Sequence, residues 1–385
     1  MRCMRRELFT ADHDDFRSMV RDFLAREVVP VFPRWLEQEL VPRDFFRDLA
    51  KVGIMGMNVE EEYGGSGPAD FTYSVVLNEE IARACVHLGP LRCHTDVVMP
   101  YFRAYANAEQ RKRWFPGIAS GDLFTAIAMT EPGTGSDLAG IRTSAVRDGD
   151  DWILNGAKTF ITGGITAELC IVVTRTATDP ENRRNGLTLL VVEDGMPGFT
   201  KGRKLDKIGL PVQDTAELSF VDVRVPAANV LGEEGQGFSY LGQNLAGERL
   251  SIAMGSIAAA QAALAVTLDY VQDRKVFGKP VSSFQNTKFE LAAVATDLEA
   301  GQALFDKAVV EHNRDELTPA DAAKVKLFCT ELQGRVMDRC LQLFGGYGYM
   351  NEYPIARLYA DARVSRIYGG TSEVLKTIIS KSLGL

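Results

Sequence analysis

The sequence lacks the features that mark nucleic-acid-binding, membrane and secreted proteins. Its 385 residues carry 43 Lys and Arg against 51 Asp and Glu, a formal net charge of −8, with no basic cluster. This balance argues against nucleic acid as a main partner. There is no run of eighteen apolar residues and therefore no expected membrane span. The first residues also lack the apolar stretch of a secretory signal.

Cysteine is scarce and scattered, and no CxxC pair occurs. The six cysteines are Cys3, Cys85, Cys93, Cys170, Cys329 and Cys340. Free, mostly buried thiols of this kind fit a reducing compartment, so we expect a cytoplasmic protein. The stretch "CVHLGPLRCH" adds His87 and His94 to two of the cysteines. Its irregular spacing and apolar surroundings favour a core or pocket wall over a metal site, so no metal is expected.

Hydrophobic periodicity divides the chain into three parts. Residues 1–120 show helical spacing of apolar side chains, as in "HDDFRSMVRDFLAREVVPVF". Residues 121–231 change to alternating, β-branched segments with no helix of normal length between them, which predicts a mostly antiparallel sheet or small barrel. Residues 232–385 return to long Ala-rich helices and predict a four-helix, up-and-down bundle. The expected fold class is mainly α with a central β domain.

A glycine-rich turn, "AMTEPGTGSD", follows the first predicted strand. Its backbone N–H groups and hydroxyls could bind an anion or the polar edge of a heterocycle. A plain glycine turn that closes a hairpin is the alternative, and spacing alone favours it. The dinucleotide fingerprint GxGxxG and the P-loop are both absent from the sequence.

From this turn onward, several stretches together resemble the acyl-CoA dehydrogenase family. They are "AMTEPGTGSDLAGI", "WILNGAKTFIT", "DRKVFGKP", "SFQ", "CLQLFGGYGYMNEYP" and "ARVSRIYGGTSEV", in that order. The family's order of helical domain, β domain and four-helix bundle is the order that periodicity predicts. The likeness is greatest to the long-chain branch, where "IYGGT" occurs together with a "QERL"-like stretch.

The resemblance implies a bound FAD and assigns residues to it. The positions that match contacts of the flavin ring are Ala128, Met129, Thr130, Gly135, Ser136, Phe160, Ile161 and Thr162. Three positions match contacts to the FAD of a neighbouring subunit: Arg274, Phe277 and Gln285. Three match the loop that binds the pyrophosphate and adenosine of that FAD: Gln342, Gly345 and Gly346. Thr371 and Glu373 match cofactor contacts at the last helix. The implied substrate contacts are Ser136, Arg249, Tyr368, Gly369 and Gly370. Because some of these positions contact the FAD of a neighbouring subunit, the resemblance also implies an oligomer, and we expect a homotetramer.

The catalytic base is the point at which this chain departs from most of the family. Most members carry a glutamate at the position of Gly369, which has no side chain. In the long-chain and isovaleryl branches the base instead matches Glu248, in "NLAGERLSIAMG". The resemblance therefore implies Glu248 as base and leaves Gly369 a backbone N–H for the thioester oxygen.

The implied activity is FAD-dependent oxidation of a saturated acyl thioester to the trans-2-enoyl product. The acyl carrier is coenzyme A or acyl carrier protein, and the electrons pass to an electron-transferring flavoprotein. A flavin oxidase on the same fold is one alternative. A catalytically silent flavoprotein that serves as an assembly partner is another, because Gly369 lacks a carboxylate.

Overall fold

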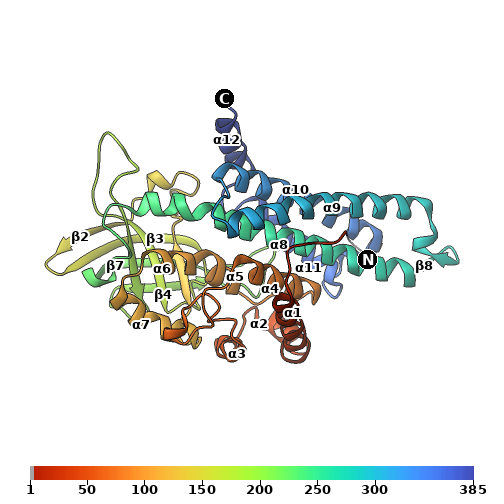
Figure 1. Ribbon diagram of the computed structural model, residues 1–385, viewed down its shortest axis with the longest axis horizontal. Helices are drawn as coiled ribbons and strands as arrows, with labels where there is room; N and C mark the ends of the chain where they lie inside the picture. Colours follow the sequence, from red (N-terminus) through yellow and green to blue (C-terminus); the bar gives the residue numbers. More distant parts are fainter. Residues whose placement is uncertain (1–3) are drawn as a thin grey trace.

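The computed structural model describes residues 4–385, so Cys3 lies outside the described residues, and it arranges the chain as three consecutive parts (Figure 1). The first part is helical, as predicted. Its helices and helical turns are α1 (Ala11–Phe23), η1 (Leu24–Val28), α2 (Phe32–Gln38), α3 (Phe45–Lys51), η2 (Glu61–Tyr63), α4 (Phe71–Arg83), α5 (Leu91–Cys93), η3 (His94–Val98), α6 (Met99–Tyr105) and α7 (Ala108–Ala119). Asn107 caps α7 by accepting a hydrogen bond from the backbone of Gln110.

The second part is a seven-stranded sheet. Its strands are β1 (Thr125–Ala128), β2 (Ser144–Asp148), β3 (Asp151–Thr162), β4 (Leu169–Arg175), β5 (Leu187–Glu193), β6 (Phe199–Lys204) and β7 (Thr215–Pro226). The order is β1-β4-β2-β3-β7-β6, with β5 paired to β4. Most pairs are antiparallel, as predicted, but β1 runs parallel to β4. The β2–β3 hairpin turns at Gly149, whose φ of 63° lies in the left-handed region that glycine adopts without strain.

The third part is helical again, so the predicted fold class is confirmed. Its elements are α8 (Gly237–Asp273), the hairpin β8 (Lys275–Val276) and β9 (Lys279–Pro280), α9 (Gln285–Asn313), α10 (Pro319–Phe344), α11 (Pro354–Ala362) and α12 (Ser372–Ser382), with short helical turns between some of them. Only α8, α9 and α10 are long. Helix α12 buries only Ser372 and Leu375 completely and projects from the bundle (Figure 1). The predicted boundaries after residues 120 and 231 both fall between elements.

Helix α8 is the central element of the third part. By length and composition alone it is apolar enough to cross a membrane, but 72% of its most apolar window is buried inside the molecule. Buried side chains from Leu250 to Leu264 contribute to the core formed with α9 and α10. A helix surrounded by protein needs apolar residues on most of its faces, and this packing accounts for its composition.

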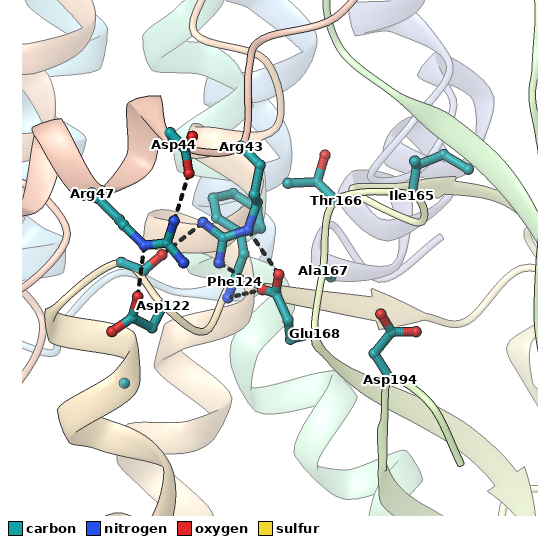
Figure 2. Close-up of polar contacts among 12 residues, drawn as sticks. Arg43, Asp44, Arg47, Asp122, Phe124, Ile165, Thr166, Ala167, Glu168 and Asp194 are labelled. Carbon is teal, nitrogen blue, oxygen red and sulfur yellow. Dashed lines mark hydrogen bonds and ion pairs between the residues drawn. The ribbon is translucent and has the colours of Figure 1, made fainter. Parts of the chain in front are cut away.

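The first two parts are joined by a polar cluster at the start of the sheet (Figure 2). Arg43 binds both carboxylate oxygens of Glu168, at 2.7 and 2.8 Å, and donates to the Gly121 carbonyl. Glu168 also accepts the backbone N–H of Phe124. Such a bidentate pair fixes orientation as well as distance. The helices of the first part are thereby held against the ends of β1 and β4.

Candidate active site

Glu248 lies inside the molecule on α8, with only 7% of its surface exposed. Its Oε1 accepts a hydrogen bond of 2.7 Å from the hydroxyl of Tyr101, a fully buried side chain of α6. Burial raises the pKa of the Glu248 carboxyl to about 7, and the Tyr101 hydrogen bond and nearby Arg249 only partly offset that rise. A carboxyl of this kind can accept a proton near neutral pH.

Gly369 lies in the loop before α12, with a φ of +62°. The flanking carbonyls of Tyr368 and Gly370 both accept hydrogen bonds from the Nζ of Lys326, at 2.6 and 2.5 Å. Lys326 is fully buried on α10. Burial lowers the pKa of its ammonium to about 8, and the Arg249 guanidinium adds to the lowering. The loop conformation around Gly369 is thus fixed by a buried cation.

Ile252 connects these two features. It lies four residues after Glu248 on α8, and therefore on the same helix face. A Cβ added to Gly369 would lie 2.3 Å from the Ile252 Cδ1 atom. The Gly369 loop therefore packs against α8 one turn beyond the carboxyl. Glycine adopts this positive φ without strain, and any side chain at 369 would have to displace the end of the Ile252 side chain.

Arg249 is buried beside Glu248, with 5% of its surface exposed. Its Nε has no hydrogen-bond partner among the described residues. A buried guanidinium without a partner is costly. The side chain therefore fits the predicted role of binding an anionic or polar group of a ligand.

Two pockets flank the shared α8 face. Glu248 lines one of them together with Asp96, Arg103, Asn244 and His312. The other begins at Ile252 and Tyr368 and continues along α8 at Gly255, Ser256 and Ala259. A ligand with its reactive carbon at Glu248 therefore lies in the first of these pockets.

The residues predicted to contact the flavin ring lie together at the ends of β1 and β3. The backbone N–H of Thr159 donates to the Thr130 carbonyl, and the buried Lys158 donates to the Met129 carbonyl and to Glu131. Ala128 ends β1, Ser136 and Gly135 are exposed in the loop that follows, and Ile161 and Thr162 end β3. The structure thus brings all of these residues to one edge of the sheet.

The second predicted cofactor group lies at the far end of α8. Arg274, Gln342, Gly345 and Gly346 line one pocket there, and the Arg274 guanidinium lies 5.2 Å from the centre of the Tyr347 ring. Phe277 and Gln285 lie on or beside the adjoining hairpin, at the right in Figure 1. Arg274 follows Glu248 by 26 residues on this helix, about 39 Å at 1.5 Å per residue. Thr371 caps α12 beside Gly370, and Glu373 is exposed.

Both groups of residues fit a flavin cofactor. The β3–β7 pairing is irregular between Lys158 and Ile161, and this turns the Phe160 ring outward with a φ of 60° and 68% exposure. An outward aromatic face beside free backbone groups suits a flat heterocycle. At Gly345 and Gly346 an added Cβ would meet nothing within 4 Å, so their backbone is open to a close-lying phosphate.

Three site residues were not predicted from the sequence, and two of them gave little signal. Tyr101 lies in the apolar stretch "VVMPYFRAY", where nothing distinguishes it from a core aromatic. Ile252 is an ordinary apolar position of α8. Lys326 does carry a signal, because it shares helical spacing with the buried Ala322 and Cys329. A lysine within an apolar stripe indicates a buried, partnered cation.

The stretch "CVHLGPLRCH" forms part of a pocket wall and of the core, which is the interpretation that the sequence favoured. His87 and Cys85 line the pocket beyond Ile252. His94 stacks on Phe124 and its Nδ1 lies 2.8 Å from the Thr125 hydroxyl. Across residues 4–385, no group of three or more His, Cys, Asp or Glu is placed to hold a metal ion.

This arrangement of three parts around a buried carboxyl and an open sheet edge defines a class of flavoenzyme that oxidises thioesters. Residues 10–122, 126–223 and 235–384 match the family models for the N-terminal, middle and C-terminal domains of acyl-CoA dehydrogenases. The chain belongs to the acyl-CoA dehydrogenase family and is an oxidoreductase acting on acyl-CoA.

Individual relatives agree with this assignment. The chain is 44% identical, over 98% of its length and 88% of the relative's, to the mitochondrial long-chain specific acyl-CoA dehydrogenase of Sus scrofa. It superimposes with a TM-score of 0.95 and 45% identity on a crystal structure of acyl-CoA dehydrogenase from Geobacillus kaustophilus, covering 99% and 100% of the two chains. A glutaryl-CoA dehydrogenase from Mycobacterium smegmatis, solved in complex with FADH2, matches with a TM-score of 0.89 and 30% identity over 98% and 95%.

Proposed function

We propose that the protein is an FAD-dependent acyl-CoA dehydrogenase that uses Glu248 as its catalytic base and forms a trans-2-enoyl thioester. The observation that carries the proposal is the buried carboxyl of Glu248, whose pKa is raised to about 7, one helical turn from the contact between Ile252 and Gly369. Electrons leave to an electron-transferring flavoprotein, as the family resemblance implies. Anaerobic bleaching of the flavin by an acyl-CoA tests the activity directly.

Each residue has a defined task in this reaction. The Glu248 carboxylate removes a proton from the α-carbon of the acyl group. The backbone N–H of Gly369, in a loop held by Lys326, donates to the thioester oxygen as it gains negative charge. When bound, FAD supplies the acceptor for the hydride that leaves the β-carbon. The Tyr101 hydroxyl orients the carboxylate through their hydrogen bond.

The pH dependence of the reaction should report Glu248. Its active form is the carboxylate, so kcat/KM is expected to fall as pH drops below about 7, tenfold per unit well below that value. Tyr101→Phe removes a hydrogen bond that favours the charged form, so the midpoint should move to higher pH. Tyr105→Phe is the control, because its hydroxyl contacts Gln243 and Asn244 instead. An unmoved midpoint in Tyr101→Phe would contradict the assignment.

The two cofactor groups support an oligomer. Arg274, in the second group, lies about 39 Å along α8 from Glu248, next to which the flavin ring lies in the proposed reaction, so one FAD is too short to contact both within a single chain. Phe277 is 95% exposed on its hairpin, as a residue that reaches a neighbour would be. We expect a tetramer built as a dimer of dimers with about one FAD per chain. Light scattering with absorbance detection measures both quantities, and a monomer that retains its FAD would contradict this assembly.

A further inference from the structure

A buried ion pair joins the two segments that carry the predicted flavin contacts. Lys158, on β3, is fully buried, and Glu131, in the glycine-rich turn after β1, is 7% exposed. The Lys158 Nζ lies 2.9 Å from the Glu131 Oε1 and donates to the Met129 carbonyl at 3.0 Å. Replacing a buried ion pair with apolar side chains often leaves stability unchanged, so packing alone does not account for this one.

Glu131 is held in place by the backbone around it. Its Oε2 accepts the N–H of Arg142 and its Oε1 accepts the N–H of Thr143, both at 2.8 Å. Its own backbone exchanges two hydrogen bonds with Thr134, at 2.9 and 3.1 Å. Hydrogen bonds from N–H groups favour the ionised carboxylate. The Lys158 ammonium is therefore paired with a negative charge whose position is fixed.

Lys158 in turn fixes the direction of the peptide between Met129 and Thr130. This peptide is trans, so its carbonyl and its N–H point in opposite directions. Because the Met129 carbonyl points at the buried ammonium, the Thr130 N–H points away from it. Both residues are partly exposed, and none of residues 4–385 accepts this N–H. The Thr130 carbonyl accepts the N–H of Thr159, so the residue is held on both sides of its unused donor.

The charge of Lys158 strengthens this donor. Burial lowers the pKa of the ammonium to about 8, and Glu131 opposes the lowering, so the group is charged at neutral pH. A cation that binds the carbonyl of a peptide polarises it, and the N–H of the same peptide becomes a better donor. Such a donor gains most from an acceptor that becomes more negative during the reaction. A flavin ring that receives electrons is an acceptor of this kind.

We propose that Lys158 is a positioning residue for the flavin, because it aims and polarises the Thr130 N–H, which binds the flavin ring more tightly in its reduced form. The inference rests on the proposed function, which places the flavin at this edge of the sheet. Lys158 has no exposed surface, so it acts through the Met129–Thr130 peptide and not by touching the cofactor. Glu131 keeps the ammonium charged and in place.

The test replaces Lys158 with methionine, which has similar bulk and no charge. The two-electron reduction potential of the bound flavin is measured by equilibration with a reference dye, without any acyl-CoA. FAD released on dilution of the holoprotein is measured by its fluorescence. A charge-assisted hydrogen bond is about twice as strong as a neutral one, so the preference for reduced over oxidised flavin should fall by about tenfold. This factor corresponds to a potential about 30 mV more negative. More FAD should also be released.

A double variant separates the lost donor from the carboxylate that Lys158→Met leaves unpaired. Lys158→Met with Glu131→Gln removes both charges, and the glutamine oxygen can still accept a backbone N–H. The potential should stay below the wild-type value in this variant too. A double variant that returns to the wild-type potential would overturn the proposal, since the shift would then come from the unpaired carboxylate alone.

Lys201→Met is the matched control. Lys201 lies on β6 of the same sheet and donates to the carbonyls of Ala167 and Ile165, at 2.7 and 3.2 Å, which are outside the predicted flavin contacts. Its loss should leave both the potential and the release of FAD at wild-type values. If Lys158→Met lowers thermal stability and leaves the potential unchanged, the lysine is merely structural and the proposal fails.

A measurement on the wild-type holoprotein decides the outcome even if Lys158→Met does not fold. Hydrogen exchange of the Thr130 amide, followed by mass spectrometry, should be slower in the reduced holoprotein than in the oxidised one, because the acceptor is stronger. Equal exchange in the two forms would overturn the proposal. A wild-type protein that does not bind FAD would instead contradict the proposed function.

Discussion

Replacing Glu248 with glutamine is expected to slow flavin reduction by acyl-CoA by about 10² to 10⁴, the usual cost of losing a general base. Glutamine has nearly the same shape and can still accept the hydrogen bond from Tyr101, but it cannot take the α-proton. Stopped-flow absorbance under anaerobic conditions measures the rate. FAD content and acyl-CoA binding, measured by titration, should persist in the variant. Reduction at near wild-type speed would place the base elsewhere.

A carboxylate moved to position 369 provides the complementary experiment. Gly369→Glu in the Glu248→Gln background puts the base where most of the family has it, but the new Cβ would lie 2.3 Å from the Ile252 Cδ1 and the residue would keep a φ of +62°. We therefore expect little recovery from this double variant. Adding Ile252→Val removes the Cδ1 methyl, so partial recovery is expected only in the triple variant.

Replacing Lys326 with methionine is expected to lower the rate of flavin reduction by about 10²-fold, near the effect of losing one oxyanion donor. The carbonyls of Tyr368 and Gly370 would lose their buried cation, and the Gly369 N–H between them would lose its fixed direction. The vibrational frequency of the bound thioester carbonyl measures this directly, because a poorly aimed donor polarises the carbonyl less.

Lys324→Met is the matched control for this substitution. Lys324 lies on the same helix two residues earlier, is 48% exposed and pairs with Asp321 at the surface. An exposed pair of this kind contributes little to stability, so both the rate and the carbonyl frequency should stay at wild-type values. If Lys326→Met lowers thermal stability but leaves the carbonyl frequency unchanged, its role is structural only.

The fold could be predicted from the sequence because the patterns that indicate helices and strands lie within short segments of the chain. The change from helical spacing to alternation and back again marks the three parts, and caps such as Asn107 and Thr318 define helix starts. Helix α12 is short, and its apolar residues follow helical spacing although only Leu375 among them is fully buried. The parallel pairing of β1 with β4 was missed, since no local pattern encodes a partner forty residues away.

Only part of the candidate site could be predicted from the sequence. Glu248 and Gly369 were found because the family motifs mark them, and their roles stay predictions. The residues that adjust them come from elements distant in sequence. Tyr101 is 147 residues from Glu248, and Lys326 is 42 residues from Tyr368. Lys158 looked like one charge among many, and only packing shows that its side chain is fully buried.

The contact between Ile252 and Gly369 also bears on how such enzymes diverge. A glutamate that arises at position 369 while Ile252 is present must displace the end of the Ile252 side chain. A smaller residue at 252 removes the need for that displacement, so a carboxylate at 369 is accommodated more readily beside it. The residues at 252 and 369 are therefore expected to vary together among relatives that place the base at one position or the other.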